Sequence, residues 1–156
     1  MQQVEAGRNA YRAGGLLVQF LLPLRHWILK DDVLWTEEGH RLSWRMMLRS
    51  KAGHFQYKIV DKENPQDTIF LEHKNYLTAK QIRALGSKPD MIWQFAQRIG
   101  EGYQKSGKEV EVYVDSKVSV NGRPYASFID PKVDLAAEKW DHFKHHEWIL
   151  PSPIEE

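Results

Sequence analysis

Cysteine is missing from this 156-residue chain, and so is a large excess of charge of either sign. The lack of cysteine excludes disulfide bonds, thiolate zinc sites and a cysteine nucleophile. A formal net charge of +1 gives no molecule-wide field, so no nucleic-acid partner is predicted. Gly-rich phosphate loops, a nucleophile elbow and a metalloprotease helix are also absent. The 42% apolar and 28% charged residues indicate one globular domain.

A long apolar run is missing too. The most apolar stretch, residues 16–29, is shorter than the ~20 residues of a spanning helix, and Pro23 and Arg25 interrupt it. Three interpretations remain open: a helix on the domain's own core, an interfacial anchor with Arg25 and Trp27 at headgroup level, or the tail of a longer membrane helix. Periodicity favours the core helix. We divide the chain into an N-terminal part, 1–30, which contains this stretch, and a single domain, 31–156.

Period-two alternation predicts an antiparallel sheet. Valines occupy alternate positions from Val110 to Val120, with Ser116 among them, and Asn121-Gly122 is a strong hairpin signal. Residues 50–53 are predicted to form a turn. The predicted strands cover residues 40–49, 54–60, 68–73, 110–120 and 125–129.

Two helices are predicted between the third and fourth strands. Thr78 and Gln81 have the spacing of a capping box, and this helix ends near Gly86. The next helix has Pro89 in its first turn, an apolar stripe at helical spacing, and a stop at Gly107. The predicted fold is α+β: an antiparallel sheet of about five strands, a helix pair on one face, and an apolar N-terminal helix.

A row of arginines is the most informative chemical feature. Arg41, Arg45 and Arg49 alternate along one predicted strand face. Guanidinium groups bind carboxylates bidentately, so the row suits an acidic peptide. A solvated face with cross-strand pairs to Glu111 or Asp115 is the competing interpretation.

Two other clusters are interpreted as structural. Glu37 and Glu38 are neighbours whose side chains point to opposite sides of an extended chain, which favours turn solvation or capping over an acid/base pair. The spacing of His142, His145 and His146 fits no standard zinc motif, which favours a polar surface segment over a metal site.

Asp130 and Asp134 flank a proline, and turn chemistry is the simplest account of that segment. The chain also has six tryptophans. Trp44 and Trp93 occupy predicted core-facing positions, and Trp27 is predicted to face a membrane surface.

Several blocks occur in order along the chain: PLRHW (23–27), VLWTEEGHRLSWRMMLRSKAG (33–53), PDMIWQFAQRI (89–99), VEVYVDSKVSVNGRPYASFIDPKVDLA (110–136) and WILP (148–151). Together these blocks resemble the vitamin K-dependent γ-glutamyl carboxylase-like family, bacterial type, in its C-terminal lumenal portion.

The resemblance implies an extramembrane substrate-recognition domain of a multi-pass membrane protein, soluble as an isolated fragment. Family enzymes use vitamin K hydroquinone, but their catalytic lysine lies in the membrane portion, so this chain is expected to bind no cofactor or metal and to be inactive alone. The expected partners are an acidic, glutamate-containing peptide and, through residues 16–29, a membrane. An independent soluble binding module is the alternative. The predicted substrate-binding residues are His40, Arg41, Ser43, Trp44, Arg45 and Arg49.

Overall fold

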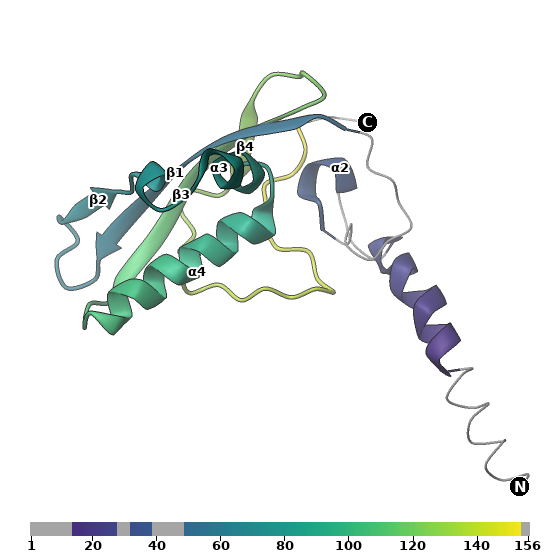
Figure 1. Cartoon of the computed structure of the whole chain (residues 1–156), viewed down its shortest axis with the longest axis horizontal. Helices are drawn as coiled ribbons and strands as arrows, with labels where there is room; N and C mark the ends of the chain where they lie inside the picture. The colour runs from purple at the N-terminus through teal and green to yellow at the C-terminus, as the bar shows by residue number, and fades with distance from the viewer. Residues whose placement is uncertain (1–13, 28–31, 39–48, 154–156) are drawn as a thin grey trace, which may run out of the picture.

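A four-stranded antiparallel sheet in the order β2-β1-β3-β4 is the central element of the computed structural model, which describes residues 14–27, 32–38 and 49–153 (Figure 1). Strands β1 (Lys51–Asp61) and β3 (Val110–Val120) pair along their whole lengths, with Tyr57 opposite Val114. The short strands β2 (Thr68–Phe70) and β4 (Ala126–Ile129) pair with β1 and β3 respectively.

Helices cover one face of this sheet (Figure 1). The 3-10 helix η2 (His73–Asn75) leads into α3 (Ala79–Leu85), and α4 (Pro89–Lys105) packs against β3. The predicted capping box is present, because Thr78 Oγ1 accepts from Gln81 N and Gln81 Oε1 accepts from Thr78 N. A left-handed residue, Gly107 with φ 80°, follows α4. The α+β class and the helix pair are thus confirmed.

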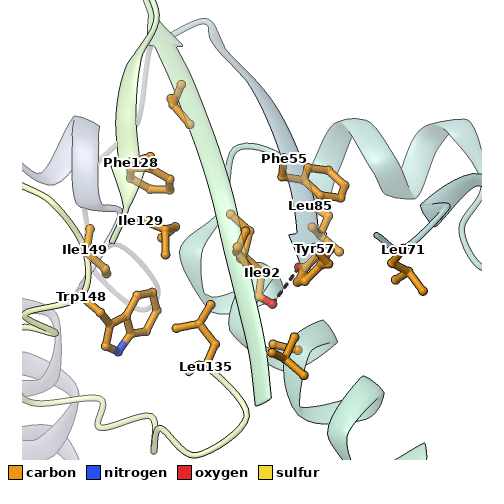
Figure 2. Close-up of a cluster of buried hydrophobic side chains, with 14 of the residues drawn as sticks. Phe55, Tyr57, Leu71, Leu85, Ile92, Phe128, Ile129, Leu135, Trp148 and Ile149 are labelled. Atoms are coloured by element: carbon orange, nitrogen blue, oxygen red, sulfur yellow. Dashed lines mark hydrogen bonds between the residues drawn. The ribbon is translucent and has the colours of Figure 1, made fainter. Parts of the chain in front are cut away.

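The core lies between the helices and the sheet (Figure 2). The valines at alternate positions of β3 are buried, as predicted. Tyr57 is fully buried, and its hydroxyl donates to Ile92 O of α4 at 2.9 Å, which ties the sheet to the helix. The largest fully buried side chains on the two layers and the C-terminal segment include Tyr57, Ile59, Ile92, Val112, Phe128, Ile129, Leu135 and Ile149.

Residues 50–53 do not form the predicted turn, because Lys51 already begins β1. The reason for a glycine at position 53 is a close approach of two backbones. A Cβ atom on Gly53 would lie 1.8 Å from Gly86 O, at the C-terminal end of α3. Gly53 therefore lets α3 pack directly onto the strand.

The C-terminal segment covers the β4 edge of the sheet. Asp130 N donates to Trp148 O and Leu150 N donates to Phe128 O, both at 2.9 Å, and Ile129 forms a bridge with Ile149. The hydrogen bonding of this segment extends to the N-terminal side, where Trp35 Nε1 donates to Leu150 O at 2.7 Å. This segment therefore joins β4 to α2 (Val33–Thr36).

Two features differ from the predicted architecture. The structure shows four strands where about five were predicted, and the remaining predicted strand, 40–49, lies almost wholly outside the described residues. The predicted apolar N-terminal helix on the core is not shown either. Residues 14–21 have helical backbone and lead into the 3-10 helix η1 (Leu22–Trp27), but Leu17 is 62% exposed and Phe20 is 59% exposed. The segment extends away from the sheet (Figure 1) and buries little of its apolar surface.

Candidate functional site

A one-turn helix positions two consecutive carboxylates. Asp32 caps α2, because its Oδ1 accepts from Leu34 N at 2.8 Å. Glu37 ends the helix in the left-handed conformation with φ 58°, and its N–H donates to Val33 O. Beyond this turn, Glu37 and Glu38 contact different parts of the chain.

Glu37 meets two cations at the start of β1. Its Oε1 lies 2.5 Å from Arg49 Nη2 and 3.3 Å from Lys51 Nζ. The Lys51 ammonium is enclosed: it donates to Trp35 O at 2.5 Å and lies 4.1 Å from the centre of the Phe128 ring. Burial lowers the pKa of Lys51 to about 8, with the positive charge of Arg49 acting in the same direction and Glu37 opposing it.

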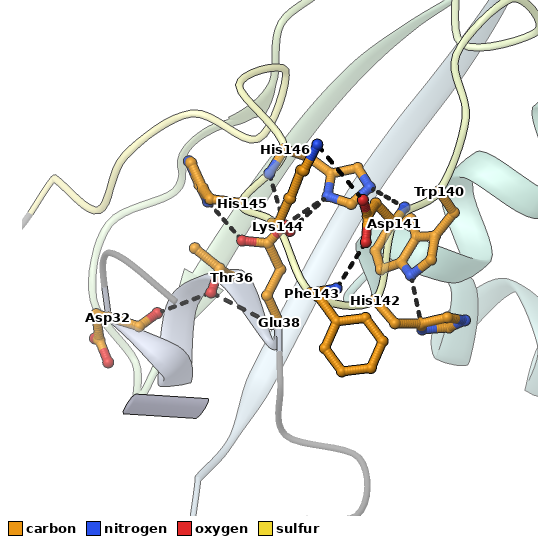
Figure 3. Close-up of polar contacts among 10 residues, drawn as sticks. All are labelled: Asp32, Thr36, Glu38, Trp140, Asp141, His142, Phe143, Lys144, His145 and His146. Atoms are coloured by element: carbon orange, nitrogen blue, oxygen red, sulfur yellow. Dashed lines mark hydrogen bonds and ion pairs between the residues drawn. The ribbon is translucent and has the colours of Figure 1, made fainter. Parts of the chain in front are cut away.

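Glu38 is buried against the C-terminal segment and accepts three hydrogen bonds (Figure 3). Its Oε1 accepts from His146 N at 2.9 Å and lies 3.0 Å from His146 Nδ1. Its Oε2 lies 2.5 Å from His145 Nδ1. The prediction of turn solvation for Glu38 is wrong, because only 4% of the residue is exposed and its partners lie more than 100 positions away. The expected divergence of the two glutamates agrees with their different partners.

The contacts of His146 determine its tautomer. Asp141 N–H donates to His146 Nε2 at 3.0 Å, so Nε2 accepts and carries no proton. The proton therefore lies on Nδ1, which faces Glu38 Oε1. His146 is only 7% exposed and stacks near Trp140, with the ring centres 4.3 Å apart. Both of its nitrogens are used in holding the segment.

His145 is placed differently. Its Nδ1 faces Glu38, while the ring lines a polar cavity of about 610 Å³ and its side chain is 26% exposed. The prediction of a polar surface segment therefore fails for His145 and His146, whereas His142 is exposed. Among residues 14–27, 32–38 and 49–153, no group of three or more His, Asp or Glu side chains is arranged to hold a metal ion.

Of the predicted substrate-binding residues, the structure describes only Arg49. His40, Arg41, Ser43, Trp44 and Arg45 lie outside the described residues. Arg49 pairs with Glu37 rather than with the predicted cross-strand partners. One of those, Glu111, instead accepts from the Tyr113 hydroxyl at 2.8 Å.

The turn chemistry predicted after β4 is confirmed. Asp130 Oδ1 accepts from Lys132 N at 2.9 Å, which closes an Asx turn. Asp134 Oδ1 accepts from Ala136 N at 3.0 Å and also from Val112 N at 2.8 Å, so it ties the turn to β3. Trp93 packs at the edge of the core.

The sequence profile of the vitamin K-dependent gamma-carboxylase lumenal domain matches residues 12–155. The chain belongs to this family. The match confirms both the suspected family and the lumenal portion of it. It makes the chain an extramembrane domain of that family. No solved structure matches the chain.

Within the described part of this gamma-carboxylase lumenal domain, no helix is long and apolar enough to cross a membrane.

Sequence reasoning about this gamma-carboxylase lumenal domain missed the joint role of Glu38, His145 and His146. The only available signal was the placement of charged residues beside tryptophans and aliphatic residues, in the segments 33–38 and 145–150. Such a placement indicates partial burial, and a buried carboxylate needs donors. The sequence does not say which donors, because the partners are 107 and 108 positions apart.

Proposed function

We propose that this domain recognises an acidic, glutamate-containing peptide close to a membrane surface, as a non-catalytic part of a vitamin K-dependent gamma-carboxylase family protein. The observation that carries the proposal is the pairing of Arg49 and Lys51 with the single carboxylate of Glu37. The ion pairs place two cations on one carboxylate, with the charge of Asp32 also acting on Lys51. Arg41 and Arg45 precede this cluster in the sequence and add further positive charge.

An unpaired donor of Arg49 supports the binding of a peptide carboxylate at this site. Its Nη2 is paired with Glu37, but its Nε is buried and has no hydrogen-bond partner among the described residues. A buried guanidinium donor without an acceptor is costly, and a carboxylate is the acceptor that it binds best. A peptide glutamate near Arg49 would use this donor and balance the remaining charge.

The N-terminal segment supports a position near lipid. Its exposed apolar side chains all lie on one continuous stretch of helical backbone, which η1 follows. Such a stretch suits the headgroup boundary of a bilayer better than water. The exposed apolar residues are Leu16, Leu17, Val18, Phe20 and Leu21.

Vitamin K hydroquinone is a cofactor of the family enzymes. The polar cavity that His145 lines fits this molecule poorly. That cavity is lined mainly by charged side chains, whereas an isoprenoid hydroquinone needs apolar walls. The proposal therefore assigns binding, and not the carboxylation step, to this chain. Fixation of labelled CO2 by the isolated chain, given vitamin K hydroquinone and a glutamate peptide, would contradict it.

Peptide titration tests the recognition role. A fluorescent glutamate-rich peptide should bind the wild-type chain, and the same peptide with glutamine at each glutamate should bind at least tenfold more weakly. Loss of one charge-assisted pair is worth about 1.5–3 kcal/mol, or roughly 10- to 150-fold in Kd. Arg45→Gln and Arg49→Gln should each weaken binding by about that factor.

Arg83→Gln is the matched control, because Arg83 is an exposed arginine on α3. It should leave the Kd unchanged. Equal binding of the glutamate and glutamine peptides, or an equal loss in all three variants, would contradict a specific carboxylate site.

An independent protein-binding module is the second candidate function. A groove of about 390 Å³ along α4 favours it, lined mainly by apolar and aromatic side chains of α4 and of the residues that flank η2, with Arg98 among them. Its other lining residues include Leu71, Tyr76, Phe95, Ile99 and Tyr103.

Liposome flotation separates the two candidates. Flotation that disappears on deletion of residues 1–29 supports the membrane-proximal domain. No flotation of the full chain, together with peptide binding that Arg98→Gln weakens and Arg49→Gln does not, supports the independent module.

A further inference from the structure

We propose that the cavity beside His145 binds the free amino terminus of a peptide, with His145 Nε2 accepting a hydrogen bond from the ammonium group. This site is distinct from the carboxylate site at Arg49, and it does not depend on the function proposed above. It rests on the orientation of one imidazole ring, on a buried donor in the same cavity and on the charges around it.

Glu38 orients the ring. Its Oε2 lies 2.5 Å from His145 Nδ1, so the ring donates its Nδ1 proton to the carboxylate (Figure 3). A carboxylate that holds one imidazole nitrogen fixes both the tautomer and the ring orientation. The lone pair of neutral His145 is then on Nε2, which points away from Glu38 because the two ring nitrogens diverge.

Glu38 is itself held in place, so the orientation does not depend on His145 alone. Its other oxygen accepts from the backbone and the ring of His146. His146 uses its remaining nitrogen as an acceptor for Asp141 N–H. The dyad of Glu38 and His145 therefore rests on a hydrogen-bonded support, and His145 is the member of this cluster that retains a free ring nitrogen among the described residues.

One residue of the cavity lining, Trp148, has a buried donor without an acceptor among the described residues. Trp148 is only 5% exposed, and the donor is its indole Nε1. Buried indole N–H groups normally find an acceptor. A peptide amino terminus supplies both missing partners: an ammonium donor for His145 Nε2, and a carbonyl oxygen, three bonds from the ammonium nitrogen, as an acceptor for Trp148 Nε1.

The charges around the cavity favour a cation. The carboxylates in its lining outnumber the ammonium groups by four to two, and one of the lysines, Lys144, lies 4.0 Å from the carboxylate of Asp141. Glu38 adds a further buried negative charge behind His145. The charged lining residues are Asp130, Glu138, Asp141, Glu147, Lys139 and Lys144.

Selective chemical modification tests the free lone pair. Diethyl pyrocarbonate acylates an imidazole nitrogen that has an available lone pair. His145 should react at least tenfold faster than His146, whose two nitrogens are both engaged. Glu38→Gln should slow His145 severalfold relative to the exposed His142, since partners that orient an imidazole change its function by about tenfold or more. Glu147→Gln is the matched control, because Glu147 lines the same cavity and forms no hydrogen bond or ion pair with the His145 ring. It should leave the ratio unchanged.

Nitrogen NMR of the unmodified wild-type chain makes the test independent of any variant's folding. It should show the His145 proton on Nδ1 and a bare Nε2. Titration with glycylglycinamide should then shift the His145 ring and the Trp148 indole resonances to saturation, and N-acetyl-glycylglycinamide should shift neither. A proton on Nε2 with a bare Nδ1, equal effects of the two peptides, or no effect of either would overturn the proposal.

Discussion

Two apolar regions of this protein differ in burial: one is enclosed and the other is exposed. The face shared by β1 and β3 is buried under α3 and α4, with Tyr57 and Val114 fully enclosed. Residues 14–21 are also apolar, yet Leu16, Leu17 and Phe20 are more than half exposed. The difference teaches that apolar composition alone does not decide burial. The strands have a complementary helical layer to pack against, whereas the described part of the chain provides none for the N-terminal segment.

The largest expected effect is in the sheet. Phe128→Ala removes a fully buried ring that contacts Trp35 edge-on, with ring centres 5.4 Å apart. Truncation of a buried phenylalanine costs about 3–5 kcal/mol in the free energy of unfolding. Urea denaturation followed by tryptophan fluorescence measures it. A loss below about 1 kcal/mol would show that β4 is not part of the cooperative core.

Gly53→Ala tests the close approach between the sheet and the helical layer. The new Cβ would lie 1.8 Å from Gly86 O, so one backbone must move. Overpacking of this kind costs about 2–3 kcal/mol. Gly102→Ala is the matched control, because a Cβ at that helical position meets nothing within 4 Å. Thermal unfolding of both variants should show a lower Tm for Gly53→Ala alone.

Burial of Lys51 in the enclosed region makes the free energy of unfolding depend on pH. Burial lowers the pKa of Lys51 from 10.5 to about 8. Between these two pH values the unfolded chain holds the lysine proton and the folded chain does not, so the free energy of unfolding rises with pH across this window. The stability of the wild type relative to Lys51→Met should therefore increase by about 2 kcal/mol from pH 7 to pH 10.

The exposed Lys117, also in a central strand, supplies the control for that measurement. Lys117→Met should show no such change relative to the wild type. Urea midpoints at several pH values measure both differences. If the difference in free energy of unfolding between the wild type and Lys51→Met did not change with pH, the ammonium of Lys51 would not be desolvated in the folded chain.

The smallest expected effect on stability is in the N-terminal segment. The double change Leu17→Ala and Leu21→Ala removes two exposed side chains, and it should alter the free energy of unfolding by less than about 0.5 kcal/mol. The same change should reduce liposome flotation, because each buried methylene contributes about 0.8 kcal/mol to membrane transfer. A large loss of stability would place these leucines in a packed interface and remove the contrast between the two regions.

Local signals predicted the elements that depend on nearby residues. The capping box of α3, the glycine stop after α4, the valine alternation of β3 and the Asx turn at Asp130 are all present. Each involves partners within a few residues, or a repeat that follows from strand geometry. The turn at 50–53 was wrongly predicted, because glycine at position 53 serves a contact with Gly86 rather than a bend.

The candidate site was mostly unpredictable for the opposite reason. Glu38 and His145 each looked like surface residues, and their contact joins positions 107 apart. Of the predicted arginine face, the described residues include only Arg49, which pairs with Glu37. The recognition role of Arg41 and Arg45 therefore stays a prediction.

The sequence by itself determined the family, the α+β class and the helix pair, because ordered motifs, periodicity and capping are properties of neighbouring residues. Only the tertiary structure decided which apolar segment is buried and which glutamate is enclosed by histidines. These outcomes depend on which distant surfaces meet. The free energy of burying an apolar or charged group is set by those partners, and not by the residue's neighbours along the chain.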